Sequence, residues 1–292
     1  MLKPGFIFID KASGPSSFQI VKKLKRLTGL KSGHTGTLDP FAEGVLPIAL
    51  GKATRLIEYV QSSRKGYIFT IKFGANTDSL DLTGEVVKES SACPNQEQLS
   101  NIIKKFTGKQ LQQPPIFSAL KVAGKAAYKY ARAGEEVELK PRPIEIYSLE
   151  LLEFNQDIAR FNVTCSKGTY IRALARDICA ELDCCGHVVF LRRTENAQPQ
   201  GAKLLSSKAL ESISLTELES YIYEADKILT NLDSMSFSEH SAKLLKHGTK
   251  LYRNDLPFSI NQVIKAKLCS KFFAVLLIKE AYIKPLKLLD NK

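Results

Sequence analysis

One carboxylate lies at the centre of a segment near the amino terminus that is rich in glycine and proline. The segment, residues 33–47, reads GHTGTLDPFAEGVLP and contains three glycines and two prolines around Asp39. This composition excludes a long helix and predicts a tightly turned loop. Pro40 favours an extended backbone at Asp39, which directly precedes it. Asp39 could therefore serve as a nucleophile, a general base or a metal ligand, or could only cap a turn.

A second group of polar residues lies further along the chain. Residues 166–178 read SKGTYIRALARDI, which predicts a strand end, a glycine turn and then a helix that Thr169 caps. The apolar residues of that helix form one face, and Arg172 lies off this face in the first turn. Arg172 is either a surface residue paired with Asp177 or Glu181, or it contacts a group near the preceding strand end.

The periodicity of the apolar residues predicts the elements that must position these side chains. Residues 65–74 alternate as a strand, with Tyr67, Phe69, Ile71 and Phe73 on one face, where an aromatic residue is most often part of the core. Further strands are predicted at 6–10, 45–50, 142–146, 160–165, 186–194 and 272–278, and helices at about 17–28, 53–61, 95–106, 125–131, 171–182 and 239–247. This pattern agrees with an α+β fold.

The composition is that of an ordinary soluble protein, with 44% hydrophobic and 25% charged residues. The net charge is +12, and residues 1–72 carry 12 Lys and Arg against 4 Asp and Glu, while residues 231–292 carry 11 against 5. Basic charge at both ends favours a polyanion such as nucleic acid as the partner, over a merely solubilising surface. No apolar run reaches the roughly 18 residues of a membrane span, and no signal peptide is apparent. We therefore expect a cytoplasmic protein that does not cross a membrane.

The cysteines do not form a metal-binding pattern. Six of them, at positions 93, 165, 179, 184, 185 and 269, lack a C-x-x-C spacing with partner histidines. The adjacent Cys184 and Cys185 are poorly placed to bind one zinc ion, so we expect free or buried thiols in a reducing cytosol. A phosphate-binding glycine motif is also missing from the sequence. The expected protein uses no metal and no cofactor.

Residues 33–40, followed by GVLP at 44–47 and GKATR at 51–55, resemble the catalytic motif of the TruB family of tRNA pseudouridine-55 synthases. In that family the aspartate of the motif is the essential catalytic residue, which implies this role for Asp39. The KGTYIR sequence at 167–172 resembles the motif whose arginine pairs with that aspartate, which implies that Arg172 lies beside Asp39. A guanidinium there is expected to lower the pKa of Asp39 and to hold both carboxylate oxygens in a bidentate fork.

The resemblance also implies substrate-binding roles for three further residues. Tyr67 falls on the family's active-site tyrosine, which stacks on the target base. Leu191 corresponds to a hydrophobic residue that packs against the same base. His34 is the family's candidate for filling the space that the flipped base leaves, and its alternative role is to stabilise the loop.

The fold implied by the resemblance is a mixed, mainly antiparallel sheet flanked by helices, the pseudouridine synthase fold. Residues 1–228 are expected to form the catalytic domain, with an RNA-clamping insertion at about 109–142 that closes over the T-arm of tRNA. Residues 229–292 are expected to form a small β-rich, PUA-like RNA-binding domain, with an ordinary β-rich appendage as the alternative. The expected enzyme is a monomer that isomerises uridine 55 of tRNA.

Two other classes of function remain open from the residues alone. An RNA-binding or RNA-folding module would share the charge and the fold but would tolerate the loss of Asp39. A glycoside or nucleoside hydrolase would need a second carboxylate about 5–10 Å from the first. Glu43 is the only acidic residue close to Asp39 in the sequence that could supply it.

Overall fold

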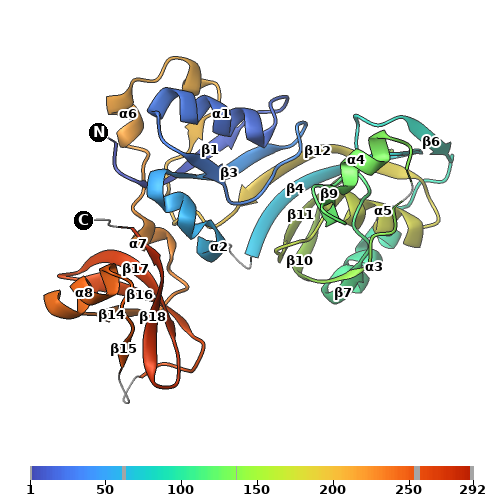
Figure 1. Cartoon of the computed structure of the whole chain (residues 1–292). Coiled ribbons are helices and arrows are strands. Elements are labelled where there is room, and N and C mark those ends of the chain that lie inside the picture. Colours follow the sequence, from blue (N-terminus) through green and yellow to red (C-terminus); the bar gives the residue numbers. More distant parts are fainter. Residues whose placement is uncertain (1, 61–63, 136, 253–256, 290–292) are drawn as a thin grey trace.

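The computed structural model describes residues 2–60, 64–135, 137–252 and 257–289. Within these ranges nine strands form one large sheet, and five strands form a second sheet near the carboxyl terminus (Figure 1). The path of the large sheet is, in order, β13 (Leu205–Ser206), β1 (Gly5–Lys11), β3 (Glu43–Leu50), β12 (Gly186–Glu195), β4 (Arg64–Phe73), β11 (Ile158–Ser166), β10 (Arg142–Asn155) and β7 (Gly108–Gln112), and β2 (Ser32–His34) pairs with β3. The second sheet contains, in order, β14 (Ser234–Ser236), β16 (Val263–Leu268), β17 (Lys271–Ile278), β18 (Tyr282–Leu288) and β15 (Leu251–Tyr252).

Short hairpins and helices surround the large sheet. The hairpins are β5 (Ala75–Thr77) with β6 (Val86–Glu89), and β8 (Lys121–Val122) with β9 (Lys125–Ala126). The described helices are α1 (Ser17–Thr28), η1 (Gly51–Leu56), α2 (Ile57–Val60), α3 (Gln96–Phe106), α4 (Ala127–Arg132), α5 (Ile171–Glu181), η2 (Ala209–Glu211), α6 (Leu215–Glu219), α7 (Ala225–Ile228) and α8 (Glu239–Lys246). In Figure 1, α1 and α6 lie at one end of the large sheet, and α3, α4 and α5 lie at the other.

Two long central strands carry the sheet from one group of helices to the other. β12 pairs parallel with β3 and antiparallel with β4, and β4 continues antiparallel into β11 (Figure 1). The predicted alternation along β4 is confirmed, because Tyr67, Phe69, Ile71 and Phe73 are all buried. These side chains join the main hydrophobic core that the helices cover. The fold class predicted from the sequence therefore agrees with the observed mixed, mainly antiparallel sheet.

The sequence also explains how the first helix begins and ends. At the start of α1, the Ser16 side chain accepts from the Gln19 amide while the Gln19 side chain accepts from the Ser16 amide, which is a capping box. At its end, Gly29 adopts a φ of 68°, a left-handed conformation that glycine reaches without strain. The predicted helix at 17–28 is confirmed at both ends.

Two local predictions were wrong. The helix predicted at 53–61 is the 3₁₀ helix η1 followed by the short α2, and residue 61 lies outside the described residues. The Thr54 hydroxyl donates to the Gly51 carbonyl three residues earlier, which fits 3₁₀ geometry. Thr169 does not cap α5, because its hydroxyl donates to the Ser166 carbonyl. Gln112 of β7 instead bonds both the amide and the carbonyl of Tyr170, just before the helix begins.

The carboxyl-terminal sheet packs against β1 and β3 of the large sheet. Val275 of β17 belongs to the same buried cluster as Phe6, Phe8 and Val45 of β1 and β3. At the edge of this contact, Asp226 of α7 forms ion pairs with two lysines of β16, at 3.0 Å and 2.8 Å. The predicted β-rich unit near the carboxyl terminus is therefore present and is attached by both apolar and ionic contacts.

Candidate active site

The loop that carries Asp39 is held by its apolar neighbours. Leu38 and Ala42 are buried in the main core, while the Asp39 side chain remains 35% exposed. The Ser17 hydroxyl donates to the Leu38 carbonyl at 2.9 Å and accepts from the Leu38 amide at 2.8 Å. The Ala42 amide donates to the Asp39 carbonyl, which closes the turn around Pro40. The loop thus presents one carboxylate on a backbone that both α1 and the core fix in place.

Arg172 joins Asp39 to a second carboxylate. Its Nε lies 2.9 Å from Asp39 Oδ2, and one terminal nitrogen lies 3.2 Å from Asp81 Oδ2. The same guanidinium donates to the carbonyls of Ser79 at 2.7 Å and Phe117 at 2.8 Å. The implied pairing with Asp39 is present, but the expected bidentate fork is not. The fork is divided between two carboxylates because Asp81 lies on the other side of the guanidinium.

The alternative of a surface Arg172 is wrong. Arg172 is 4% exposed, and the two carboxylates considered as its surface partners are engaged elsewhere. Asp177 pairs with Arg176 at 2.8 Å, and Glu181 pairs with Lys105 of α3. Because α5 packs against β12 and β4, Arg172 in its first turn is buried against the sheet rather than exposed to solvent.

Asp81 is a site residue that the sequence did not reveal. It is buried, and its Oδ1 accepts from the Ser79 hydroxyl, the Thr83 amide and the Thr83 hydroxyl. These donors leave Oδ2 to Arg172. Nothing in the sequence linked Asp81 to Asp39 or to Arg172. The usable signal was its place between hydroxyl residues in TDSLDLTG, residues 77–84, a pattern typical of a carboxylate fixed by a turn.

The surroundings of Asp39 raise its pKa above the ordinary value for an aspartate. Burial is the largest cause, and the charge of Asp81 acts in the same direction. The guanidinium of Arg172 opposes both, and the more distant Lys11 opposes them weakly. The expectation of a lowered pKa for Asp39 was therefore wrong, because burial and a second carboxylate outweigh the arginine.

Arg193 shapes the same loop from the opposite side. It is 1% exposed, and its guanidinium donates to the carbonyls of Val45 at 2.8 Å, Gly36 at 3.1 Å and Thr37 at 3.3 Å. It also shares a hydrogen bond with the Tyr67 hydroxyl. The sequence indicated only a basic end to the strand at 186–194. Arg193 therefore fixes the backbone of the Asp39 loop and does not bind the Asp39 carboxylate.

Tyr67 and Leu191 lie side by side on the central strands. Tyr67 of β4 pairs with Arg193 of β12, and Phe69 pairs with Leu191, so all four side chains point to one face of the sheet. Burial raises the pKa of Tyr67, so its phenol stays protonated at neutral pH. Tyr67 and Leu191 are both buried, which is what residues of the core would show. They also lie on the same face of the sheet as Arg193, whose side chain contacts the Asp39 loop.

His34 lies at the end of β2, where the loop begins. Burial lowers the pKa of His34, and the charge of Arg193 lowers it further, so its imidazole is neutral at pH 7. Its Nδ1 is buried and has no hydrogen-bond partner among the described residues. The structure thus pairs Asp39 with Arg172 and links Tyr67 to the Asp39 loop through Arg193. Leu191 lies two residues before Arg193 on the same face of β12, and His34 ends β2, where the loop begins.

Two lysines add positive charge beside the loop. Lys11 is fully buried and donates to the carbonyls of Ala12, Pro15 and Pro40, and burial lowers its pKa to about 8. Burial also lowers the pKa of Lys65 to about 8. A Cβ placed on Gly36 would lie 3.4 Å from Lys65 Nζ, which puts this ammonium group against the loop. Both lysines make the site suitable for an anionic substrate.

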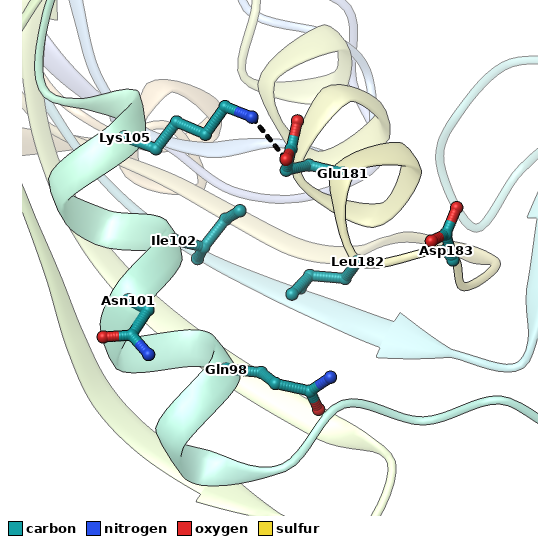
Figure 2. Close-up of a pocket in the computed structure, with 7 residues that line it drawn as sticks. All are labelled: Gln98, Asn101, Ile102, Lys105, Glu181, Leu182 and Asp183. Atoms are coloured by element: carbon teal, nitrogen blue, oxygen red, sulfur yellow. Dashed lines mark ion pairs between the residues drawn. The ribbon is translucent and has the colours of Figure 1, made fainter.

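Other features of the described chain lie away from this site. Residues 2–60, 64–135, 137–252 and 257–289 contain no group of three or more His, Cys, Asp or Glu that could hold a metal. None of the helices within those ranges has the length and apolar character needed to cross a bilayer. A groove of about 350 Å³ lies between α3 and the end of α5, under the Lys105–Glu181 ion pair (Figure 2). This groove involves the last residues of α5, whereas Arg172 lies in the first turn of the same helix.

Comparison with known proteins identifies close relatives of this chain. Residues 22–171 match the family described as TruB family pseudouridylate synthase (N terminal domain). The tRNA pseudouridine synthase B of Rickettsia akari (strain Hartford) is 44% identical over 255 residues, which cover 85% of this chain and 87% of that protein. The tRNA pseudouridine synthase B of Francisella philomiragia subsp. philomiragia is 40% identical over 284 residues, which cover 92% of this chain and 94% of that protein.

Solved structures share the fold at lower identity. A chain of an H/ACA RNP bound to a substrate RNA containing 2′-deoxyuridine aligns with a TM-score of 0.75 and 21% identity, over 98% of this chain and 85% of that chain. A chain of the archaeal box H/ACA sRNP Nop10–Cbf5 complex aligns with a TM-score of 0.73 and 21% identity, over 97% and 85%. These similarities support the fold, and the family match and the relatives go further: this chain belongs to the TruB family of pseudouridylate synthases.

Proposed function

We propose that this chain isomerises uridine to pseudouridine at position 55 in the T-loop of tRNA, with Asp39 as the catalytic carboxylate. The substrate is suggested by relatives named tRNA pseudouridine synthase B that are 40% to 44% identical. The observation that carries the role of Asp39 is its position 2.9 Å from a buried arginine, on a loop that leaves the carboxylate partly exposed. Glu43 does not share this placement, because it pairs with Arg192 instead, at 3.4 Å.

The reaction breaks the N1–C1′ bond of uridine and forms a bond between C5 of the uracil and C1′. C5 loses its proton, and N1 gains one. Substrate and product are isomers, so the overall reaction needs no net oxidant. Asp39 can attack C1′ or take a proton from the sugar, and both routes need it ionised. The raised pKa of Asp39 makes it a stronger base than an exposed aspartate, and Arg172 keeps one of its oxygens oriented.

The detached uracil must be held while it turns. Tyr67 offers a flat apolar face with a protonated hydroxyl that Arg193 fixes, and Leu191 offers an apolar surface on the same side of the sheet. A uridine inside a folded T-loop must first flip out, at a cost of roughly a few kcal/mol. The neutral imidazole of His34 lies at the entrance to the loop, where it can occupy the space that the base leaves.

The division into domains follows from the same proposal. Residues 1–228 form the catalytic domain, and residues 229–292 form a PUA-like RNA-binding domain that adds basic charge. The insertion at about 109–142 clamps the T-arm. The Phe117 carbonyl in this insertion accepts a hydrogen bond from Arg172. Arg172 therefore contacts both the RNA-clamping segment and the catalytic Asp39. This segment exposes Leu111, Ile116 and Tyr128, which suits contact with RNA bases and riboses.

The oligomeric state and the compartment belong to the proposal as well. The proposed active form is a monomer. The six cysteines are free thiols, which supports a reducing compartment such as the cytoplasm.

Tritium release tests this function directly. Unmodified tRNA labelled with [5-³H]uridine is incubated with the enzyme, beside the same tRNA carrying cytidine at position 55. We expect release from the first RNA and none above background from the second. Release from both would move the target to another uridine. Free uracil among the products would favour a hydrolase, and binding without release would favour an RNA-binding module.

A further inference from the structure

α5 ends in a turn over residues 179–184. The side chains at the first and last positions of this turn, both cysteines, lie next to each other. The Cys184 amide donates to the Cys179 carbonyl at 3.0 Å, and the Asp183 amide donates to the Ala180 carbonyl at 3.2 Å. Asp183 has a φ of 50°, in the left-handed region. These features define a Schellman motif, in which the side chains at the first and last of these positions contact each other. Here those two side chains are the thiols of Cys179 and Cys184.

The two thiols interact directly. They share a hydrogen bond, and Cys184 Sγ also lies 3.5 Å from the Cys179 carbonyl oxygen. Gly186 leaves the room that this contact needs, because a Cβ there would lie 2.7 Å from Cys179 Sγ. The hydrogen bond lowers the pKa of Cys184 and raises that of Cys179. Cys184 is therefore the thiol of the pair that more readily becomes a thiolate, and Cys179 keeps the proton.

A cavity gives small molecules access to this pair. It has a volume of about 410 Å³, and Cys179, Cys184 and Cys185 form part of its wall. Lys88 and Arg176 line the same cavity together with Glu89 and Asp183. The charge of Asp183 raises the pKa of Cys184, and the hydrogen bond from Cys179 outweighs it. Cys184 is 8% exposed, whereas Cys179 and Cys185 are each 2% exposed, so Cys184 is the first of the three that an oxidant reaches.

We propose that Cys179 and Cys184 form an oxidisable dithiol, which closes to a disulfide when a peroxide enters this cavity. The Cys184 thiol releases its proton to solvent, and the thiolate attacks one oxygen of hydrogen peroxide. The O–O bond breaks, and the hydroxide that leaves takes up the released proton to become water. The resulting sulfenic acid is attacked by the Cys179 sulfur, and water leaves with the Cys179 proton. Two thiols and one hydrogen peroxide thus give one disulfide and two waters.

The proposed bond is independent of the catalytic proposal. Cys179 lies near the end of α5, and Arg172 lies at its start, about 10 Å away along the helix axis. The disulfide closes a loop at the helix end that includes neither Arg172 nor any residue of the Asp39 loop. An Asp39→Asn variant should therefore form the disulfide as readily as the wild-type chain, whatever its activity.

Peptide mapping of the oxidised full-length chain tests this inference. The protein is treated with hydrogen peroxide, its remaining thiols are alkylated, and it is cleaved after Glu181 and at basic residues. We expect the peptides that carry Cys179 and Cys184 to be joined, with a mass two hydrogens below their sum. Dithiothreitol should separate them and restore both thiols to alkylation.

Single cysteine variants identify which two cysteines form the disulfide. It should persist in Cys185→Ser and in Cys93→Ser, and Cys184→Ser should leave Cys179 open to alkylation. The inference is overturned if Cys179 and Cys184 stay reduced at a peroxide dose that oxidises the exposed Cys93 and Cys269. It is also overturned if the joined cysteine is Cys185. The wild-type map decides the question even if Cys184→Ser does not fold.

Discussion

Arg172 and Arg193 are both buried beside the loop that carries Asp39, yet they bind different kinds of partner. Arg172 reaches two carboxylates, at 2.9 Å and 3.2 Å, and two carbonyls. Arg193 reaches three carbonyls, two of them from the Asp39 loop itself, and the Tyr67 hydroxyl. The first arginine therefore acts on the charge and orientation of Asp39, and the second acts on the shape of the loop that carries it.

This difference matters because the two kinds of bond fail in different ways. A carboxylate that loses its arginine keeps its place in the chain but loses an oriented oxygen, so chemistry should suffer more than folding. A loop that loses a buried donor leaves carbonyls unpaired, which costs folding free energy directly. Substitutions at the two arginines should separate turnover from thermal stability.

The largest effect on turnover among the supporting residues is expected for Arg172→Lys. Lysine keeps the charge, but its single ammonium cannot reach Asp39, Asp81 and two carbonyls at once. We expect turnover to fall roughly 10²- to 10³-fold, as for other lost donors in active sites. Single-turnover tritium release measures this, and tRNA binding should stay near the wild-type level. Wild-type turnover would remove Arg172 from the chemistry.

Asp81→Asn should slow turnover less and should also shift its pH dependence. Loss of one charged hydrogen bond, about 1.5–3 kcal/mol, corresponds to a fall of roughly 10- to 100-fold. The charge of Asp81 raises the pKa of Asp39, so its removal lowers that pKa. Turnover falls as pH drops through the pKa of Asp39, because the carboxylate must be ionised. The acid limb of the pH–rate profile should therefore move to lower pH in the variant.

A pH profile separates this role of Asp81 from a purely structural one. A structural loss would reduce turnover at every pH and leave the position of the acid limb unchanged. Asp78→Asn is a matched control, since Asp78 is exposed on the same turn and accepts from the Glu85 amide. An acid limb that moves to higher pH in Asp81→Asn would contradict the account.

Arg193→Lys should lower thermal stability more than it lowers turnover, the opposite of the result expected for Arg172→Lys. We expect a loss of about 3 kcal/mol of folding free energy, because the Gly36, Thr37 and Val45 carbonyls lose their shared donor. For a chain of this size that loss lowers Tm by roughly 6–12 °C. Thermal unfolding measures this change in Tm. Arg192→Lys is the control, because the Arg192 side chain is partly exposed and pairs with Asp10 and Glu43. A loss of Tm no larger than that of the Arg192→Lys control would break the comparison.

Glu43→Ala should have the smallest effect. Glu43 contacts Arg192 at 3.4 Å, and both side chains are about one third exposed, so the pair contributes little. Turnover within about 5-fold of wild type is expected. Complete loss of activity in a folded variant would revive the hydrolase hypothesis, in which a second carboxylate is essential.

Much of this architecture could be predicted from the sequence. The alternation of Tyr67, Phe69, Ile71 and Phe73 predicted the burial of β4, and Gly29 predicted the end of α1, because both depend on local chemistry. The resemblance led to Arg172 beside Asp39, which no local pattern indicates.

The errors concern contacts between distant segments. Asp81 lies far from both Asp39 and Arg172 in the sequence, so its charge could not enter the expected pKa of Asp39. Residue 170, just before α5, is held by Gln112 of β7, and no side chain caps the helix, which made the local candidate Thr169 wrong. Arg193 looked like a strand end because its carbonyl partners become its neighbours only after β12 pairs with β3.

The most direct test of the central claim compares wild type with Asp39→Asn. Tritium release from [5-³H]uridine-labelled, unmodified tRNA is measured beside the binding of the same tRNA to both proteins. Asparagine keeps the size of the side chain and removes its charge, so it cannot attack C1′ or take a proton. The account predicts release by wild type alone and binding by both. Release by a folded Asp39→Asn variant at the wild-type rate would contradict it.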